Sequence, residues 1–334
     1  MTIVFLSPRF YPDIGGVEKH AFEVAKILAR ENDVTVITEG KKDKRENLKG
    51  IKIIRLSFGK KDWFRKFIIW GKLLKYRKVI EKADIVHCHD VFFWYLPLRI
   101  IYPRKKVFTT FHGYETVFPP KTKAIFMRKL SEKLSNGNIA VGNYIRKWYG
   151  TKSNAVIYGG SEKRNIKNTK RKIGKKINIL FIGRIEKDTG VATYSEILKL
   201  LGSYNFEACG DGSLRSILEK YGKVNGFVKN LNRYIAKADI IFASSYLSII
   251  LGLSLKKPVF SAFENPLKED YLKLAPFSKW IYTAKSPKVL TKKIKTVMKN
   301  KKLREKNINL AYNWANEQTW DKITGIYLKL WSTR

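Results

Sequence analysis

The chain has 334 residues, of which 44% are apolar, enough for about two globular domains with buried cores. No apolar run reaches the roughly 18 residues that a membrane span requires, no segment resembles a signal peptide, and the two cysteines, Cys88 and Cys209, are too far apart to suggest a disulfide framework or a cysteine zinc site. Lysine and arginine number 67 against 28 acidic residues, a net charge of +39, which predicts an anionic partner: nucleic acid, a phosphate-bearing substrate or an anionic membrane surface.

Short apolar segments alternate with amphipathic ones in the first half of the chain. A helix with apolar residues at helical spacing follows the loop Ser7–Gly16, and a basic amphipathic helix is predicted over 62–81. This alternation predicts a parallel sheet covered by helices on both faces. The predicted strands are 2–6, 34–38, 51–56, 85–88, 107–111, 138–141 and 155–158.

The same pattern restarts after a polar segment, residues 161–176, which we interpret as an interdomain linker. We therefore predict an α/β protein of two Rossmann-like, doubly wound domains, 1–165 and 166–316, that face a shared cleft. The predicted strands of the second half are 177–182, 206–208, 224–228, 240–243 and 258–261, and helices follow at 287–300 and 303–330 with a break near 316–319.

A glycine pair, Gly15 and Gly16, stands between the first strand and the first helix. Glycines here let the backbone approach a phosphate and present amide groups at the start of a helix. A simple turn explains the pair equally well, because two adjacent glycines are a weaker signal than GxGxxG.

Three histidines lie near the ends of predicted strands. His112 follows the strand 107–111 and precedes a glycine, and its imidazole can donate to a sugar hydroxyl or position a leaving group. The alternative is a buried structural histidine. We predict that His87 and His89 point to opposite faces of the sheet, which argues against a joint metal site and leaves one of them to line the cleft.

Two loops of the second half carry further candidates. Arg184 follows the strand 177–182, and its guanidinium can form a fork onto a diphosphate; a capping loop with surface charges is the alternative. Gly210 belongs to the tight turn 209–214, where ordinary turn chemistry is at least as good an explanation as contact with a ligand.

Taken in order, these segments resemble the retaining glycosyltransferases of family 4, also called glycosyl transferases group 1. The resemblance covers nearly the whole chain and rests on PRFYPDIGGVEKHAFEVAKIL, FHGYE, FIGRIEKDTG, ACGDGSLR and NWANEQTWDKI. It implies the GT-B fold and transfer of a sugar from a nucleoside-diphosphate sugar to a lipid-linked or glycan acceptor, without a metal or another cofactor. It also implies that a C-terminal helix, about 317–334, packs back on the acceptor-side domain 1–165, while 166–316 binds the nucleotide sugar.

By this resemblance, Gly15 and Gly16 approach the donor phosphate, His112 contacts the transferred sugar, and Arg184 binds the diphosphate. The chain departs from the family pattern at two places. Thr189 stands where the family has a lysine, for which Lys187 is the nearest substitute. Two glutamates of the family pattern are missing, and one of their positions is Leu251.

The missing carboxylates alter the predicted donor site. A leucine cannot accept the ribose hydroxyl groups, so donor binding weakens by roughly 1.5–3 kcal/mol. Ser245 and Ser248 offer partial replacements. The alternative to an enzyme is therefore a catalytically inactive GT-B scaffold that serves as a membrane- or partner-binding module.

The predicted helix 62–81 combines aromatic residues, among them Trp63 and Phe67, with many lysines and arginines. Such a helix can lie on an anionic membrane, and the alternative is a helix packed on the sheet with solvated lysines. Nucleic acid is an unlikely partner, because charge alone supports it and no DNA- or RNA-binding motif is present. We expect a cytoplasmic protein, peripheral on the inner face of the membrane if it binds lipid.

Overall fold

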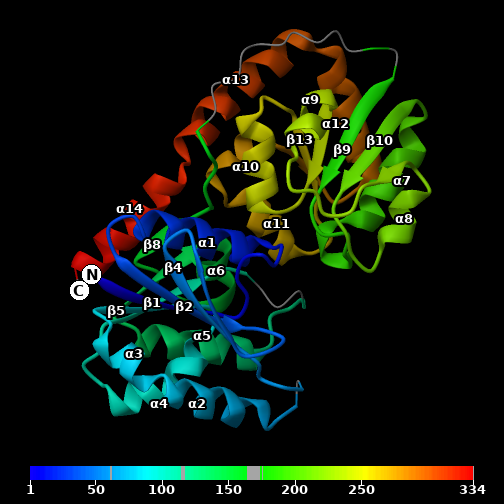
Figure 1. Ribbon diagram of the computed structural model, residues 1–334. Coiled ribbons are helices and arrows are strands. Elements are labelled where there is room, and N and C mark those ends of the chain that lie inside the picture. Colours follow the sequence, from blue (N-terminus) through cyan, green and yellow to red (C-terminus); the bar gives the residue numbers. More distant parts are fainter. Residues whose placement is uncertain (61, 114–116, 164–173, 175, 334) are drawn as a thin grey trace. The chain divides into compact units, whose positions relative to one another are not determined.

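The computed structural model describes residues 1–60, 62–113, 117–163, 174 and 176–333 (Figure 1). Backbone contacts divide the chain into two compact units. Unit 1 comprises Met1–Ile157 and Trp320–Arg334, and unit 2 comprises Tyr158–Thr319. The predicted boundary between 165 and 166 and most of the predicted linker lie outside the described residues.

Unit 1 is built on an eight-stranded sheet in the order β3-β4-β2-β1-β5-β6-β7-β8. Its neighbouring strands are parallel except for the antiparallel pair β3–β4. Strand β3 was not predicted, because four of its five residues, KREN, are polar and none of the five is buried, as is typical of an edge strand. The strands are β1 (Thr2–Ser7), β2 (Asp33–Glu39), β3 (Lys44–Leu48), β4 (Ile51–Leu56), β5 (Ile85–His89), β6 (Val107–Phe111), β7 (Gly137–Val141) and β8 (Ala155–Ile157).

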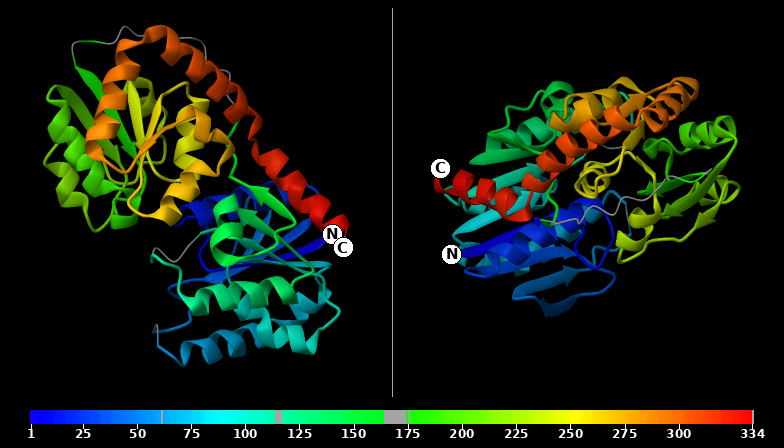
Figure 2. Two further views of the ribbon diagram at one scale, coloured as in Figure 1. Left: turned by 180° about the vertical axis from the view of Figure 1, so that it is seen from behind. Right: turned by 90° about the horizontal axis from the view of Figure 1, so that it is seen from above.

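The first helix of unit 1, α1, is amphipathic. In α1, Ala21, Val24, Ala25 and Leu28 are buried at the spacing of one helix face. α14 packs against α1 and β8 (Figure 1 and Figure 2). The helices are α1 (Gly16–Leu28), α2 (Arg65–Lys75), α3 (Arg77–Lys82), α4 (Phe92–Ile101), α5 (Thr122–Leu134), α6 (Asn143–Tyr149) and α14 (Trp320–Ser332).

The prediction of one helix over 62–81 is wrong. The chain leaves helical geometry at Tyr76, with φ −98° and ψ 12°, and restarts as α3. The Tyr76 ring lies against the guanidinium of Arg45, 5.6 Å from ring centroid to Cζ. Arg45 belongs to β3, and residues 72–81 contain no glycine or proline that would have marked the break. In the described part of the chain, no helix is long and apolar enough to cross a bilayer.

Unit 2 is built on a six-stranded parallel sheet in the order β11-β10-β9-β12-β13-β14. The predicted strand 224–228 is reduced to two residues, because the chain turns at Gly226 with φ +66°. The short strand β14 was not predicted. The strands are β9 (Ile177–Ile182), β10 (Tyr204–Cys209), β11 (Lys223–Val224), β12 (Ile240–Ala243), β13 (Val259–Ala262) and β14 (Tyr282–Ala284).

The core of unit 2 includes Phe181, Tyr194 and Phe242, which come from β9, a helix and β12. The connections are helical, as a parallel sheet requires. The helices are η1 (Lys187–Thr189), α7 (Val191–Leu201), α8 (Arg215–Glu219), α9 (Asn232–Lys237), α10 (Tyr246–Ser254), α11 (Pro266–Lys273), η2 (Pro276–Trp280), α12 (Pro287–Lys299) and α13 (Lys301–Glu317).

Both sheets are doubly wound, as predicted. In each one the strand order reverses direction beside the first strand, between β1 and β5 in unit 1 and between β9 and β12 in unit 2. Loops leave the sheet on opposite sides at such a switch point, and ligands of open α/β sheets bind outside the carboxyl ends of the strands there. The loops after β1, β5, β9 and β12 are therefore where functional side chains are expected.

Candidate active site

The glycine pair of unit 1 lies at the start of α1, but its two members differ. A side chain added at Gly16 would meet nothing within 4 Å, so the backbone is open there. At Gly15 the added carbon would lie 2.1 Å from Oε2 of Glu18, a buried residue. The Glu18 carboxylate thus fills the space beside Gly15. An anion approaching α1 would find open backbone at Gly16 and a negative charge beside Gly15.

All four histidines of the sequence gather beside the switch point of unit 1. His20 comes from α1, His87 and His89 from β5, and His112 follows β6. The His112 ring centroid lies 4.8 Å from that of His20 and 5.1 Å from that of His89. All four side chains are buried, and His112 has the largest exposed fraction at 9%.

The prediction that His87 and His89 point to opposite faces is wrong. Residues two apart on a strand share a face, and these two ring centroids are 5.2 Å apart. Cys88 between them faces the other way and belongs to an apolar core with Trp94 and Leu98. Within the described residues, no group of three or more His, Cys, Asp or Glu side chains is arranged to hold a metal ion.

A chain of hydrogen bonds links α14 to the histidines. Trp331 Nε1 donates to His87 Nδ1 at 3.1 Å, which leaves the proton of the neutral ring on Nε2. His87 Nε2 then donates to Thr110 Oγ1 at 2.7 Å. Thr110 donates to the Tyr327 hydroxyl at 2.9 Å, and Tyr327 donates to His20 Nε2 at 2.9 Å. We assign this direction because it gives every donor in the chain one acceptor.

A separate hydrogen bond determines which ring nitrogen of His112 carries the proton. Its Nε2 lies 2.8 Å from Nδ1 of His89, while Nε2 of His89 is buried without a hydrogen-bond partner. A buried N–H without a partner is rarer than a bare acceptor. We therefore assign the proton between the rings to His89 Nδ1, so that His112 carries its own proton on Nδ1. That N–H makes no hydrogen bond to any described residue and is free to donate to a ligand.

Burial keeps these imidazoles uncharged. Loss of hydration lowers the pKa of His20 to about 3. The same cause, followed by the neighbouring imidazoles, lowers the pKa of His87, His89 and His112 well below the ordinary value. The Arg128 guanidinium adds to the lowering of the His112 pKa. At neutral pH the cluster offers polar hydrogen bonds and no positive charge.

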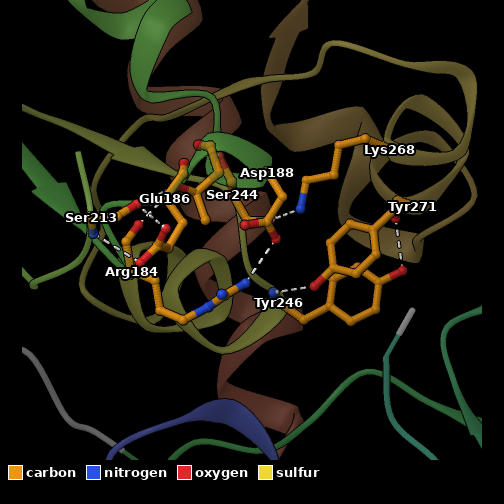
Figure 3. Close-up of polar contacts among 9 residues, drawn as sticks. Arg184, Glu186, Asp188, Ser213, Ser244, Tyr246, Lys268 and Tyr271 are labelled. Atoms are coloured by element: carbon orange, nitrogen blue, oxygen red, sulfur yellow. Dashed lines mark hydrogen bonds and ion pairs between the residues drawn. The ribbon is translucent and has the colours of Figure 1, made fainter. Parts of the chain in front are cut away.

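The candidate loop of unit 2 leaves β9 at its carboxyl end and carries charged groups. Arg184 Nη2 forms an ion pair with Asp188 Oδ2 at 2.8 Å, and the Arg184 side chain remains 50% exposed (Figure 3). Glu186 accepts hydrogen bonds from the backbone N–H and hydroxyl of Ser213, at 2.9 and 2.5 Å. These bonds to Ser213 lower the pKa of the Glu186 carboxyl. The loop thus has a fixed shape with an exposed guanidinium.

Two other predicted residues of unit 2 have different surroundings. Lys187 is exposed, and its charge acts on the carboxyl of Glu264. A side-chain carbon added at Gly210 would lie 1.7 Å from the carbonyl oxygen of Gly183. Gly210 is therefore required for close packing of two loops, which favours the turn explanation at this position.

Ser245 and Ser248 lie at the start of α10, directly after β12. The Ser245 hydroxyl donates to the Ser248 hydroxyl at 2.9 Å, and Ser245 is exposed. One pair of hydroxyl groups is therefore brought together beside the unit 2 switch point. Leu251, on the same helix, is partly buried.

A family model and several known proteins match this chain. Residues 14–160 match the model described as Glycosyltransferase Family 4. This match falls almost entirely in unit 1 and covers less than half of the chain. An uncharacterized 41.2 kDa protein in the cps region of Klebsiella pneumoniae is 28% identical over 214 residues, which cover 54% of this chain and 57% of that protein. The match thus spans little more than half of that curated relative.

Two solved structures have the same fold. A glycosyltransferase from Rickettsia africae is 18% identical, with 99% of this chain and 98% of that chain covered and a TM-score of 0.74. HepE from Anabaena, solved in complex with UDP and glucose, is 14% identical, with 100% of both chains covered and a TM-score of 0.77. These likenesses establish the GT-B fold, two Rossmann-like domains, as predicted.

The residues at which the chain departs from the family pattern have defined contacts in the structure. Thr189, which replaces the family's lysine, is buried, and its hydroxyl lies 2.8 Å from the Arg184 carbonyl oxygen and 2.7 Å from that of Glu186. It stabilises the loop and has no contact to offer a ligand. Lys268, a buried lysine of α11 beside this loop, was not predicted as a site residue. Among 67 lysines and arginines, nothing in the sequence distinguished it.

Proposed function

We propose that this protein is a retaining glycosyltransferase that moves a sugar from a nucleoside-diphosphate sugar to a lipid-linked or glycan acceptor. The exposed guanidinium of Arg184, at the switch point of unit 2, is the observation that carries the proposal. A guanidinium binds phosphate oxygens in a fork of two hydrogen bonds. The complex of HepE with UDP and glucose is consistent with a donor of this class.

In this reaction Arg184 stabilises the charge that develops on the departing diphosphate, where catalysis needs it most. His112 positions the transferred sugar through its Nδ1–H. The bond between the anomeric carbon and the diphosphate oxygen breaks, and a bond to the acceptor oxygen forms on the same face. The proton of the acceptor hydroxyl passes to the departing phosphate, so the mechanism needs no side-chain nucleophile, and neither a metal nor another cofactor is part of it.

Calorimetry with UDP-, GDP- and ADP-sugars tests the donor class. We expect saturable binding of one of them, and loss of that binding in Arg184→Ala. Lys199→Ala is the matched control, because Lys199 forms an exposed ion pair with Glu196 on α7. Equal affinity of the wild type and Arg184→Ala would remove Arg184 from the donor site.

The second candidate function is a catalytically inactive scaffold, which Thr189 and Leu251 favour because neither supplies the charged group of the family pattern. If the well-folded wild type binds none of the nucleotide sugars, this alternative replaces the enzyme. The variant Leu251→Glu then distinguishes two explanations for the failure to bind a donor. Donor affinity that appears in this variant indicates a site that lost one carboxylate, and continued failure to bind indicates a site that was rebuilt.

An anionic membrane surface is the proposed location of a lipid-linked acceptor. Trp63, Phe64 and Phe67 precede or begin α2 and are exposed by 63%, 58% and 48%. Lys66 Nζ lies 4.7 Å from the Trp63 ring centroid and 4.9 Å from that of Phe67. Farther along the helix, Ile69 is buried in the core. Exposed aromatic rings beside lysines suit the boundary of an anionic bilayer.

Sedimentation with lipid vesicles tests this surface. Binding to vesicles that contain anionic lipid should weaken in the double variant Trp63→Ser, Phe67→Ser and should be absent for neutral vesicles. Equal binding of the double variant would place the contact elsewhere.

A further inference from the structure

Lys268 is a buried cation at a position where the loops of unit 2 converge. It lies in the first turn of α11, which begins with Pro266 and is capped by Asn265, whose Oδ1 accepts from the Lys268 backbone N–H at 2.9 Å. The local sequence thus dictates the start of the helix and the place of Lys268 in it. Only 6% of its surface is exposed. Lysine is rarely buried to this extent without a partner of opposite charge.

The ammonium group is held at the switch point itself. Lys268 Nζ donates to the carbonyl oxygen of Ser244, the residue after β12, at 2.6 Å. The hydroxyl of Ser244 donates to the carbonyl oxygen of Thr189 at 2.7 Å. The ammonium is therefore tied to both loops, after β9 and after β12, between which the strand order reverses. Figure 3 shows Lys268 in one group with Arg184 and Asp188.

The ammonium group of Lys268 makes fewer hydrogen bonds within the described residues than it has donors. An ammonium has three donors, and within the described residues Lys268 makes one hydrogen bond and lies 4.0 Å from the Tyr271 ring centroid. Among the described residues, Asp188 is the carboxylate that acts on Lys268, and it forms its ion pair with Arg184. Two cations therefore share one anion at the switch point, and an incoming anion would complete the arrangement.

Lys268 also carries a positive charge near Thr189, the position at which the family pattern has a lysine. Thr189 carries no charge, and its hydroxyl is engaged by the carbonyl groups of its own loop. Lys268 brings a positive charge to the same loop from a different element. Because an ammonium is a compact charge and a guanidinium a flat fork, the pair can bind two neighbouring phosphate groups in different ways.

We propose that Lys268 and Arg184 together form the diphosphate site of unit 2, with Lys268 as the second cation. This inference rests on the proposed function, since it takes a nucleoside diphosphate as the ligand. It adds a binding residue from α11 that supplies the charge missing at Thr189.

The test compares the affinity of UDP, GDP and ADP for the full chain and two variants by calorimetry. Lys268→Met keeps the length of the side chain, suits a buried position and removes the charge. Lys273→Met is the matched control on the same helix, where Lys273 pairs with Glu269 at the surface. We expect the preferred nucleotide to bind Lys268→Met about 10-fold or more weakly at pH 7.5, and Lys273→Met within about twofold of the wild type.

The pH dependence of binding to the wild type gives a second, variant-free readout. Burial lowers the pKa of Lys268 to about 8, against the opposing effect of Asp188, and Arg184 lowers it further. The groups that face it are Asp188, Arg184 and the Tyr271 ring. Raising the pH from 7 to 9.5 removes the Lys268 proton while the phosphates stay ionised. Affinity should fall over this range in the wild type and stay level in Lys268→Met.

The outcomes separate this inference from the proposed function. If a nucleotide binds the wild type and Lys268→Met alike, or binds the wild type equally at pH 7 and 9.5, Lys268 is not part of the site although the donor class stands. If neither a nucleotide nor inorganic pyrophosphate binds the wild type, the donor proposal fails, and the assignment of Lys268 fails as well. If Lys268→Met does not fold, the wild-type pH series decides alone.

Discussion

The two units place different chemistry at the same topological position. Beside its switch point, unit 1 buries four neutral histidines that are joined by hydrogen bonds to α14 and to one another. Beside its own, unit 2 holds the charged groups Arg184, Asp188 and Lys268. Uncharged donors suit the hydroxyl groups of a sugar, and fixed cations suit a diphosphate. One sheet topology thus carries two different sets of polar groups, and the loop residues determine which set is present.

The largest expected effect is a loss of stability of unit 1 at acidic pH. In an unfolded chain a histidine takes up a proton near pH 6.5, whereas the folded cluster resists protonation, with the pKa of His20 lowered to about 3. The unfolded state therefore binds more protons, so unit 1 should lose stability as the pH falls below about 6.5, by up to about 1.4 kcal/mol per pH unit for each histidine. Unit 2 contains no histidine.

Urea unfolding at pH 7.5, 6.5 and 5.5, with protease-sensitive fragments assigned by mass spectrometry, measures each unit separately. Unit 1 should become the less stable one as the pH falls. Parallel loss in both units would mean that the histidines are not buried as neutral groups.

The next largest effect concerns Arg184 and turnover. Arg184→Ala should lower kcat/KM by about 100-fold or more, because it removes a charge aimed at the departing diphosphate. Its ion pair with Asp188 is half exposed, so the free energy of unfolding should change by less than about 1 kcal/mol. Initial rates with the preferred donor and a thermal melt check both. A stability loss that matches the loss of rate would mark Arg184 as structural.

Tyr327→Phe tests the polar network of unit 1. The change removes the hydroxyl that accepts from Thr110 and donates to His20, and leaves two buried groups without partners. The free energy of unfolding should fall by about 1–3 kcal/mol. Denaturant unfolding of Tyr327→Phe and of Ser332→Ala, an exposed change on the same helix, provides the comparison. An unchanged value for Tyr327→Phe would contradict the network.

The smallest expected effect concerns His89 as a positioning residue. His89→Leu removes the donor to His112 Nε2 and frees the His112 proton to move between its nitrogens, so kcat should fall about 10-fold. His89→Asn offers an amide donor and should retain more activity. Nitrogen-15 NMR of His112 should show the proton on Nδ1 in the wild type and a mixture in His89→Leu. A wild-type spectrum with the proton on Nε2 would reverse the assignment.

Local patterns in the sequence were enough to predict the doubly wound sheets, because buried parallel strands are continuous apolar runs such as INILFI. The same rule missed β3, whose edge position needs no apolar run, and the break at Tyr76, where the ring lies against Arg45 of another strand. Arg184 was proposed as a site residue because the loop after a first strand has a recognisable pattern, and its role stays a prediction.

Other parts of the site depend on contacts that sequence spacing does not contain. Tyr327 reaches His20 across 307 positions of the chain. Lys268 differs from the other lysines discussed above in being buried. Burial cannot be read from the sequence of a chain with so many lysines. The error about His87 and His89 was of another kind, since the two-residue period of a strand already places both on one face.

The path of the chain through unit 1 has a consequence for biosynthesis. Unit 2 is one continuous stretch, whereas unit 1 is completed by α14, which brings Tyr327 and Trp331 to the histidines. On the ribosome, α14 emerges only after all of unit 2 has been made. The first half of the chain must therefore wait with its polar cluster uncovered, while unit 2 has every residue it needs to fold. The N-terminal unit is begun first and finished last.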